Sequence, residues 1–588
     1  MSEQMVFDEN GEYKFEVREP IKGFPELRWT GKRPFKSTMY YPAQLKESYG
    51  TDVDGWMNKI FWGDNLQVMS HLLKQFRGKI DLIYIDPPFD SKADYKKKIT
   101  VKGKTVTSDS LAFEEKQYGD IWTNDEFLQF MYERLILIRE LLSEEGCLFL
   151  HVDYRKAAHL KLILDEVFGE NNFKNEIIWS FVKGASSKTS FGRKHQNILF
   201  YSKNNEKTFF NLDAVRVAYS EETIARAQRG EARYQNITAE EMAEKGKNPG
   251  DVWTQLGDEE GDVWEKVFPI QGNSVQNTMY PTQKPEALIE RIIKAGTKEG
   301  GLVFDCFMGS GTTQAVAMKL GRRFIGADIN LGAIQTTTKR LLGIADELNP
   351  TIDEEKKYTG FEVYNVNNYD FFRNPVEARD LIISALDIDK FTASSVYDGE
   401  LDGRMVKIMP VNRIATKADL AELIANMPYK TFEQRKADNP NEPVERITLV
   451  CMGHEPDLKA HLIAEVTGFK LDIEIVDILR DKADLQLKRE AEAVVVRKDN
   501  KLVIEAFYPM NLMQKLSLQK EFVDDWKQLV ESVMVDFNYD GAVLQPTITD
   551  IPGKNEFVLG EYEIPETAGT IRVKITDLLS ESLEIEVE

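Results

Sequence analysis

The sequence is poor in cysteine and histidine and has no long apolar run. The three cysteines, Cys147, Cys306 and Cys451, lie far apart among 588 residues. Their spacing excludes a zinc cluster and their odd number argues against a disulfide framework, so we expect a reducing, cytoplasmic location. The six histidines show no ligand spacing, and we expect no metal site. No apolar stretch reaches the ~18 residues of a membrane span, and the polar, acidic N-terminus does not resemble a signal peptide.

Positive charge is also scarce. Lys and Arg number 75 against 97 Asp and Glu, so the net charge is −22, which excludes a uniformly basic surface. The deficit is uneven, because residues 361–588 carry roughly −17 and residues 1–360 about −5. Two basic stretches in the first part, one around Lys92 and one from Lys183 to Arg193, are therefore candidates to contact phosphate groups. Solvated loops are the alternative interpretation.

Apolar runs alternate with helical patterns, which indicates an α/β fold with a doubly wound, mostly parallel sheet. Residues 82–86 form an apolar run that stops at a double proline, since proline cannot continue a central strand. Further strands are predicted at 147–153, 302–307 and 323–329, and helices at 126–146, 158–169 and 312–321.

Composition divides the chain into three parts. We expect an N-terminal extension over residues 1–54, a central domain over 55–345 and an acidic α+β region over 360–588. Within the central domain, residues 204–280 are polar and rich in turn-forming residues, which indicates an insertion with little core. The charge of the last part favours docking of a protein partner over contact with nucleic acid along its whole surface.

The first candidate site is Asp86-Pro87-Pro88-Phe89, at the carboxyl end of a predicted strand, where open α/β sheets bind ligands. A carboxylate and a carbonyl on a stiff loop can accept both hydrogens of an aromatic amine, which turns the nitrogen lone pair towards an electrophile. Asp86 and the Pro87 carbonyl fit these roles, and Phe89 offers a ring on which a base can stack. An ordinary proline turn is the alternative.

The second candidate is the glycine-rich run 304–313, which follows a predicted strand and precedes a predicted helix. This pattern is typical of nucleotide binding, but it lacks the lysine of a phosphate-binding loop and does not complete the dinucleotide fingerprint. A cationic ligand therefore suits it better than a pyrophosphate. Asp328, at the end of the next strand, is placed to accept ribose hydroxyls, unless the run is only a tight packing turn. Asp64, before an apolar helix, is either a helix N-cap or a ligand contact.

Together these residues resemble the beta group of DNA amino-methyltransferases, in which a DPPY-like catalytic motif precedes an FxGxG cofactor motif. Segments 63–72, 193–203 and 280–300 also match the group in order, and the resemblance covers roughly residues 55–345. It implies S-adenosylmethionine as cofactor, bound by Asp64, Asp305, Phe307, Gly309, Ser310, Gly311, Thr312, Asp328, Thr282 and Lys284. It also implies target-base or DNA contacts from His195, Tyr201, Lys92, Lys183 and Arg193.

Within the group, residues 27–32 and the long C-terminal extension resemble the modification subunit of type III restriction-modification systems. This resemblance implies methylation of adenine N6 on a base flipped out of double-stranded DNA, a homodimer and a helicase-nuclease partner. Cytosine N4 methylation and a non-catalytic, cofactor-sensing subunit are the alternatives. Two departures are Phe89, where the group usually has tyrosine, and the short insertion, which leaves the location of sequence recognition open.

Overall fold

The structure is a computed structural model. It describes residues 12–15, 25–88, 97–101, 104–108, 124–180, 189, 191–219, 221–229, 238–253, 283–348, 357–366, 379, 382–383, 386, 388–391, 396–411, 414–455, 457–478, 491–510, 512–513, 523, 525–553, 556–578 and 581–587. Four residues of the predicted site lie outside these ranges: Phe89, Lys92, Lys183 and Thr282. Among the described residues, no helix is both long enough and apolar enough to cross a membrane.

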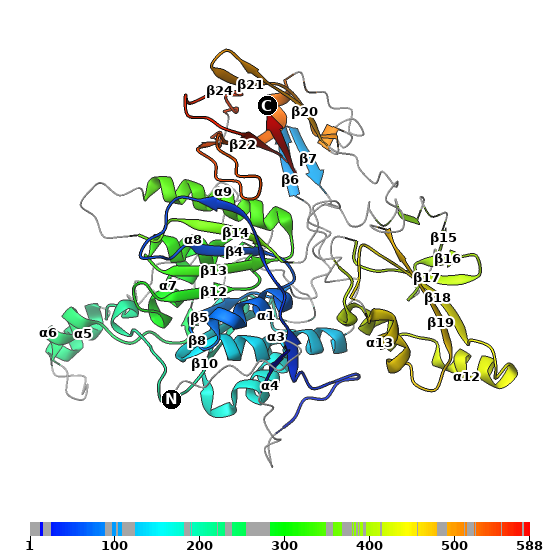
Figure 1. The fold of residues 1–588 in the computed structure, drawn as a ribbon. Coiled ribbons are helices and arrows are strands. Elements are labelled where there is room, and N and C mark those ends of the chain that lie inside the picture. The colour runs from blue at the N-terminus through cyan, green and yellow to red at the C-terminus, as the bar shows by residue number, and fades with distance from the viewer. Residues whose placement is uncertain are drawn as a thin grey trace.

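A sheet of ten described strands forms the centre of the protein (Figure 1). In spatial order its strands are β11 (Val252–Trp253), β9 (Phe173–Ser180), β10 (His195–Ser202), β8 (Leu142–Val152), β5 (Ile80–Ile85), β12 (Leu302–Asp305), β13 (Arg323–Asp328), β4 (Asn58–Trp62), β14 (Phe361–Asn365) and β3 (Gln44–Tyr49). The strands from β8 to β14 are parallel, whereas β10 and β3 run antiparallel to their neighbours. The predicted fold class is confirmed.

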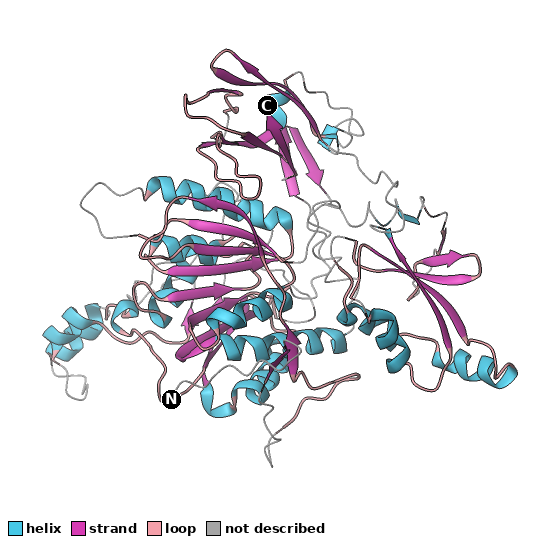
Figure 2. Cartoon of the chain, in the orientation of Figure 1, coloured by secondary structure: helices cyan, strands magenta, loops and turns pink. Residues whose placement is uncertain are grey.

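Helices cover both faces of this sheet (Figure 2). One layer comprises α1 (Asn65–Phe76), α3 (Asn124–Leu141) and α4 (Ala157–Phe168), and the other α7 (Glu286–Gly296), α8 (Thr312–Lys319) and α9 (Leu331–Glu347). Strand β5 carries the apolar run 82–85 because it is covered on both faces. Ile83 and Ile85 pack into the core of the first layer, whereas Leu82 and Tyr84 pack into the core of the second.

The sheet includes strands on both sides of the predicted sequence range 55–345. Strand β14 pairs in parallel with β4, and β3 pairs antiparallel with β14. Both strands lie outside the predicted central domain, so those limits were too narrow. The physical reason is that β3 lies near the sheet edge and is mostly half-buried, so it has no continuous apolar run that marks it as a strand.

The predicted insertion contains α5 (Glu221–Gln228) and α6 (Ala239–Lys245) before β11. Strand β11 adds to the outer edge of the sheet by pairing with β9. Trp253 of β11 is buried in the second core, and the Arg291 guanidinium lies 4.9 Å from its ring. The insertion therefore adds a short strand, β11, to the sheet.

Residues beyond the large sheet form further α+β units. One five-stranded sheet comprises β15 (Asp389–Lys390), β16 (Gly399–Leu401), β17 (Arg404–Ile408), β18 (Glu445–Cys451) and β19 (Leu471–Asp477), with helices α11 (Ala421–Ala425), α12 (Tyr429–Asp438) and α13 (Leu458–Glu465). Two smaller sheets comprise β20 (Glu492–Lys498), β21 (Lys501–Tyr508) and β24 (Glu561–Glu563), and β23 (Ile548–Asp550), β22 (Val530–Asp536), β25 (Ile571–Asp577) and β26 (Ser582–Val587). Two strand pairs complete the described strands: β1 (Glu12–Lys14) with β2 (Ser37–Met39), and β6 (Lys97–Val101) with β7 (Lys104–Ser108).

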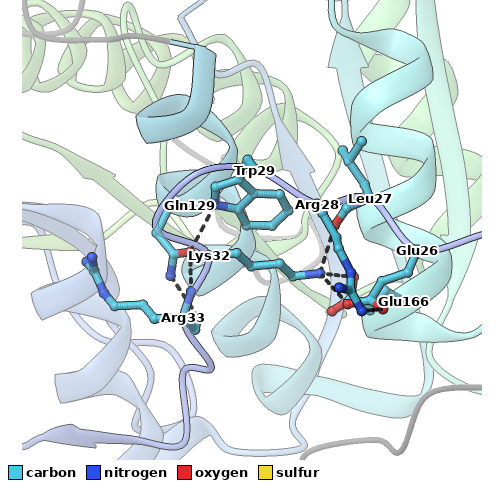
Figure 3. A network of polar contacts seen from close by, with 8 residues as sticks. All are labelled: Glu26, Leu27, Arg28, Trp29, Lys32, Arg33, Gln129 and Glu166. Atoms are coloured by element: carbon cyan, nitrogen blue, oxygen red, sulfur yellow. Dashed lines mark hydrogen bonds and ion pairs between the residues drawn. The ribbon is translucent and has the colours of Figure 1, made fainter. Parts of the chain in front are cut away.

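The segment before the large sheet is tied to α3 and α4 (Figure 3). Trp29 is buried, and its indole Nε1 donates to Gln129 Oε1 at 3.2 Å. Lys32 forms an ion pair with Glu166 at 2.8 Å and lies 4.7 Å from the Trp29 ring. The backbone N–H of Arg33 donates to Gln129 Oε1, and Gln129 Nε2 donates to the Arg33 carbonyl. Residues 27–32, which carried the narrower sequence resemblance, thus fix the positions of two helices.

Candidate functional site

Four acidic residues gather at one edge of the sheet. Strands β5, β12, β13 and β4 are adjacent and parallel, so their carboxyl ends meet at the same edge. Asp86 follows β5, Asp305 and Asp328 end β12 and β13, and Asp64 follows β4 after one glycine. This is the edge at which open α/β sheets bind ligands. The structure therefore brings together predicted residues that lie up to 264 positions apart in the sequence, from Asp64 to Asp328.

The glycine-rich run forms the turn between β12 and α8. Gly309 and Gly311 have φ angles of 51° and 70°, in the left-handed region that favours glycine. A Cβ atom on Gly311 would lie 2.4 Å from Thr337 Cγ2, so a larger residue would displace α9. The Thr337 hydroxyl donates to the Gly309 carbonyl at 3.1 Å. The turn therefore needs glycine both for its backbone and for its close contact with α9.

A buried arginine holds the rest of this turn. Arg340 of α9 donates from Nη1 to the Ser310 carbonyl at 3.1 Å and to Thr312 Oγ1 at 3.0 Å. Its Nη2 pairs with Glu286 Oε1 at 2.7 Å. Because both partners of this ion pair are largely buried, the contact ties the glycine-rich turn to the start of α7.

The carboxylates at the ends of β12 and β13 organise the turn through backbone hydrogen bonds. Asp305 accepts from Phe307 N at 2.9 Å and from Thr313 Oγ1 at 2.6 Å. Asp328 accepts from Gly309 N at 2.8 Å and from the following turn. Burial raises the pKa of Asp305 to about 7, with a smaller contribution from the charge of Asp86, and burial raises that of Asp328 to about 6. The raised pKa values therefore reflect the burial of two carboxyl groups, which disfavours their ionised forms.

Asp64 caps α1, as one of the two sequence interpretations predicted. Its Oδ1 accepts from the backbone N–H groups of Leu66 and Gln67 at 2.9 and 3.3 Å. Its Oδ2 forms an ion pair with Arg134 at 3.0 Å. Arg134 also donates from Nε to Asn65 Oδ1 at 2.5 Å. Sequence reasoning missed Arg134, although an arginine inside the apolar pattern of α3 is a signal of a buried ionic contact.

Asp86 has one occupied and one unoccupied carboxylate oxygen. Lys284 Nζ forms an ion pair with Asp86 Oδ2. Within the described part of the chain, Asp86 Oδ1 is buried and has no hydrogen-bond partner. Pro87 and Pro88 follow directly and stiffen the backbone. Lys284, which the resemblance assigned to the cofactor, is thus placed on the carboxylate of the predicted catalytic motif.

A buried polar chain lies in the sheet beneath this carboxylate. The Tyr84 hydroxyl and His151 Nδ1 are 2.9 Å apart, and His151 Nε2 lies 2.8 Å from Gln196 Oε1. Burial, and then the positive charge of Lys284, lower the pKa of His151 to about 4. The imidazole is therefore neutral near pH 7 and contributes no charge beside Asp86.

Strand β10 brings only part of its predicted residues to the same edge. Because β10 is antiparallel to β8, its first residue, His195, lies near the carboxyl edge and its end lies at the opposite edge. His195 is exposed, and the preceding Arg193 stacks on Tyr154, with its guanidinium 4.2 Å from the ring. Tyr201 is instead fully buried at the far end, where its hydroxyl donates to Asp165 at 2.6 Å. The structure therefore contradicts a target-base contact for Tyr201.

The sequence has clear relatives among known proteins. Residues 80–339 match the DNA methylase family N6_N4_Mtase. The chain is 33% identical over 254 residues to the type II methyltransferase M1.MboII of Moraxella bovis, which covers 43% of this chain and 85% of that protein. It is 29% identical over 264 residues to the DNA adenine methyltransferase YhdJ of Escherichia coli, covering 45% and 76% of the two chains.

Longer relatives and solved structures also match. The StyLTI Mod subunit, a type III restriction-modification enzyme of Salmonella typhimurium, is 26% identical over 379 residues, covering 50% of this chain and 55% of that subunit. This chain thus spans about half the length of that relative. A solved M1.HpyAVI-SAM complex aligns with 48% of this chain and 98% of that chain, at 20% identity and a TM-score of 0.29.

The family match includes the glycine-rich turn and three of the four acidic residues at the edge of the sheet, Asp86, Asp305 and Asp328. The predicted resemblance is confirmed at this level. The chain belongs to the N6/N4 family of DNA methylases.

Proposed function

We propose that the protein transfers a methyl group from S-adenosylmethionine to the N6 amine of adenine in double-stranded DNA. The observation that carries this proposal is Asp86 Oδ1, a buried acceptor without a hydrogen-bond partner among the described residues, on a proline-stiffened loop beside the glycine-rich turn. A buried oxygen without a partner is costly, so its persistence favours a ligand that donates a hydrogen bond there. The amine of a base is such a donor.

The residues present suit S-adenosylmethionine. Its sulfonium group is a cation, and a cation bound at this edge would favour the ionised forms of the buried Asp305 and Asp328 carboxyl groups, whose pKa values burial raises. The turn 309–312 allows a ligand to approach the backbone closely, because Gly309 and Gly311 have no side chain. These residues, with Asp64 and Phe307, would hold the cofactor. When bound, the cofactor supplies the electrophilic methyl group.

Asp86 then orients the amine. Its Oδ1 accepts one amine hydrogen and the Pro87 carbonyl accepts the other, which localises the nitrogen lone pair. Because a base inside a duplex cannot reach this buried oxygen, it must leave the stack, and Phe89 is assigned to stack on it. Cytosine N4 carries a similar amine, so the same residues would serve it. The name of the adenine methyltransferase YhdJ, a relative at 29% identity, supports adenine.

The surface beside β8 and β10 fits DNA. Arg193 and Lys194 are exposed there, and the Arg193 guanidinium lies against the half-exposed ring of Tyr154. The side chain of Phe191 is 97% exposed. Exposed cations suit contacts with phosphate groups, and exposed aromatic rings suit stacking with bases. The relatives named Mod subunits support a place in a restriction-modification system with a restriction subunit as partner. The homodimer rests on the sequence resemblance alone.

The test is methylation of DNA in a bacterial host without methyltransferases of its own. Single-molecule sequencing should find N6-methyladenine at one sequence motif with the wild-type chain and none with Asp86→Ala. The matched control is Glu442→Gln, an exposed acidic residue outside the site, which should leave methylation unchanged. N4-methylcytosine would correct the base. No modification by a folded chain that binds the cofactor, with or without a restriction subunit, would favour a sensing role and refute the proposal.

A further inference from the structure

We infer that Lys284 is a positioning residue for Asp86, which fixes the catalytic carboxylate so that its free oxygen faces the target amine. The inference rests on the proposed function and deepens it, because it assigns the orientation of Asp86 to a residue of a different segment. The resemblance had placed Lys284 against the cofactor instead. The two assignments differ in what a substitution changes.

The contacts of Asp86 support the positioning role. Its Oδ2 forms an ion pair with Lys284, and the two side chains are only 17% and 11% exposed, respectively. At this burial an ion pair is screened far less than on the surface. A carboxylate can rotate about its last bond, which would exchange its two oxygens. The ammonium on Oδ2 opposes that rotation and leaves Oδ1 as the acceptor for a ligand.

The position of Lys284 is itself fixed by the following helix. Pro285 is the N-cap residue of α7, with a φ of −67°. Glu286, the first residue of the helix, pairs with Arg340 at 2.7 Å and with Lys319 at 2.8 Å. The backbone at Lys284 is therefore restrained, because the next residue is Pro285 and the one after it, Glu286, is anchored by two ion pairs.

The same anchor reaches the glycine-rich turn. Arg340 binds Glu286 with one nitrogen and the Ser310 carbonyl and Thr312 hydroxyl with the other. Polar contacts thus join the turn 309–312 to Glu286, the backbone leads from Glu286 through Pro285 to Lys284, and Lys284 contacts Asp86. The turn assigned to the methyl donor and the acceptor carboxylate are consequently both tied to the segment 284–286, as an in-line transfer requires.

The positive charge of Lys284 also has an effect below the carboxylate. After burial, it is the next largest cause of the low pKa of His151. The ammonium therefore lies near both Asp86 and the Tyr84–His151 pair. This location is at the end of β5, under the place assigned to the target amine.

The experiment compares Lys284→Met and Lys284→Arg with the wild-type chain. The matched control is Lys294→Met, the same substitution on α7 at a residue whose ion pair in the described part of the chain is with its helical neighbour Glu290, at 2.5 Å. Two quantities are measured on DNA of the established motif: the single-turnover methylation rate at saturating cofactor, and the dissociation constant for S-adenosylmethionine. Thermal melting of each variant identifies unfolded protein.

We expect Lys284→Met to lower the single-turnover rate about 10- to 100-fold, because a small displacement of a reacting group has effects of this size. The cofactor dissociation constant should change less than about threefold, and Lys284→Arg, which keeps the ion pair, should retain most of the rate. A purely structural role would instead lower rate and affinity together, without rescue by arginine, and would overturn the inference.

Two further results would contradict it. Weaker cofactor binding with an unchanged saturated rate would make Lys284 a cofactor contact, and an unchanged rate and affinity would leave it without a role. A wild-type chain that methylates no DNA would refute the proposed function itself, so the two failures can be distinguished.

Discussion

The carboxyl group of Asp305 allows a direct test of the electrostatics of this site. Burial raises its pKa to about 7, whereas an ordinary aspartate has a value of 3.8. Asp305→Asn removes the ionisable group and keeps its shape. The amide oxygen can accept from Phe307 N, and the amide nitrogen can donate to the Thr313 hydroxyl. The substitution therefore isolates the effect of ionisation.

The sign of the effect follows from proton binding. Between pH ~4 and ~7 the folded protein holds a proton on Asp305 that the unfolded chain has released, so stability falls as pH rises through this window. The slope is about 1.4 kcal/mol per pH unit, which gives a loss of about 3 kcal/mol between pH 5 and pH 8. His151 acts in the opposite direction, because its pKa is lowered to about 4 and its contribution to stability rises with pH up to ~6.5.

The comparison of two proteins removes the contribution of His151. Urea unfolding of the cofactor-free wild type and Asp305→Asn is measured at pH 5 and pH 8. The variant should gain about 3 kcal/mol relative to the wild type at the higher pH. Cofactor binding to the wild type should also strengthen as pH rises through 7, since a cation favours the ionised carboxylate, and this dependence should weaken in the variant. Parallel stability curves for the two proteins would refute the reasoning.

Three other substitutions test separate contacts. Arg134→Met removes the buried partner of Asp64 and Asn65, so it should lower the free energy of unfolding by about 3 kcal/mol. It should also weaken cofactor binding, and an unchanged thermal shift on adding cofactor would contradict this. Trp29→Ala removes a buried ring and should destabilise the protein by about 3–5 kcal/mol in thermal unfolding, whereas a loss below about 1 kcal/mol would show that the N-terminal segment does not hold α3. Arg193→Ala should weaken DNA binding and reduce its salt dependence by about one phosphate contact, and an equal salt dependence would exclude a phosphate contact.

The sequence predicted the central elements of the fold, and several of its candidate residues lie together in the structure. Continuous apolar runs mark β5, β12 and β13, because a parallel strand covered on both faces has no polar side. Asp86 directly follows β5, and β12 and β13 end at Asp305 and Asp328. Parallel pairing alone brings these three residues to one edge. Local patterns were sufficient here, because each acidic residue comes directly after the apolar run of its own strand in the sequence.

Contacts between distant segments were not accessible in this way. Lys284 and Asp86 are 198 positions apart, and no local pattern pairs them. Tyr201 was misplaced because the direction of β10 decides which end of the strand reaches the site, and direction depends on its partners rather than on its own sequence. Strand β3 was missed for a related reason, since a half-buried edge strand needs few apolar residues.

Helix α9 joins the C-terminal region to the site and affects how that region can be tested. Thr337 and Arg340 contact the glycine-rich turn, whereas Gln335 donates to Ser582 Oγ at 2.5 Å and Lys339 pairs with Glu531 at 3.2 Å. The helix therefore holds the turn through some side chains and the C-terminal region through others. Removal of residues beyond 350 would delete these contacts as well as any partner surface. Loss of activity in a truncated chain would consequently not identify a partner site, whereas exposed substitutions in the acidic region leave α9 intact and separate the two effects.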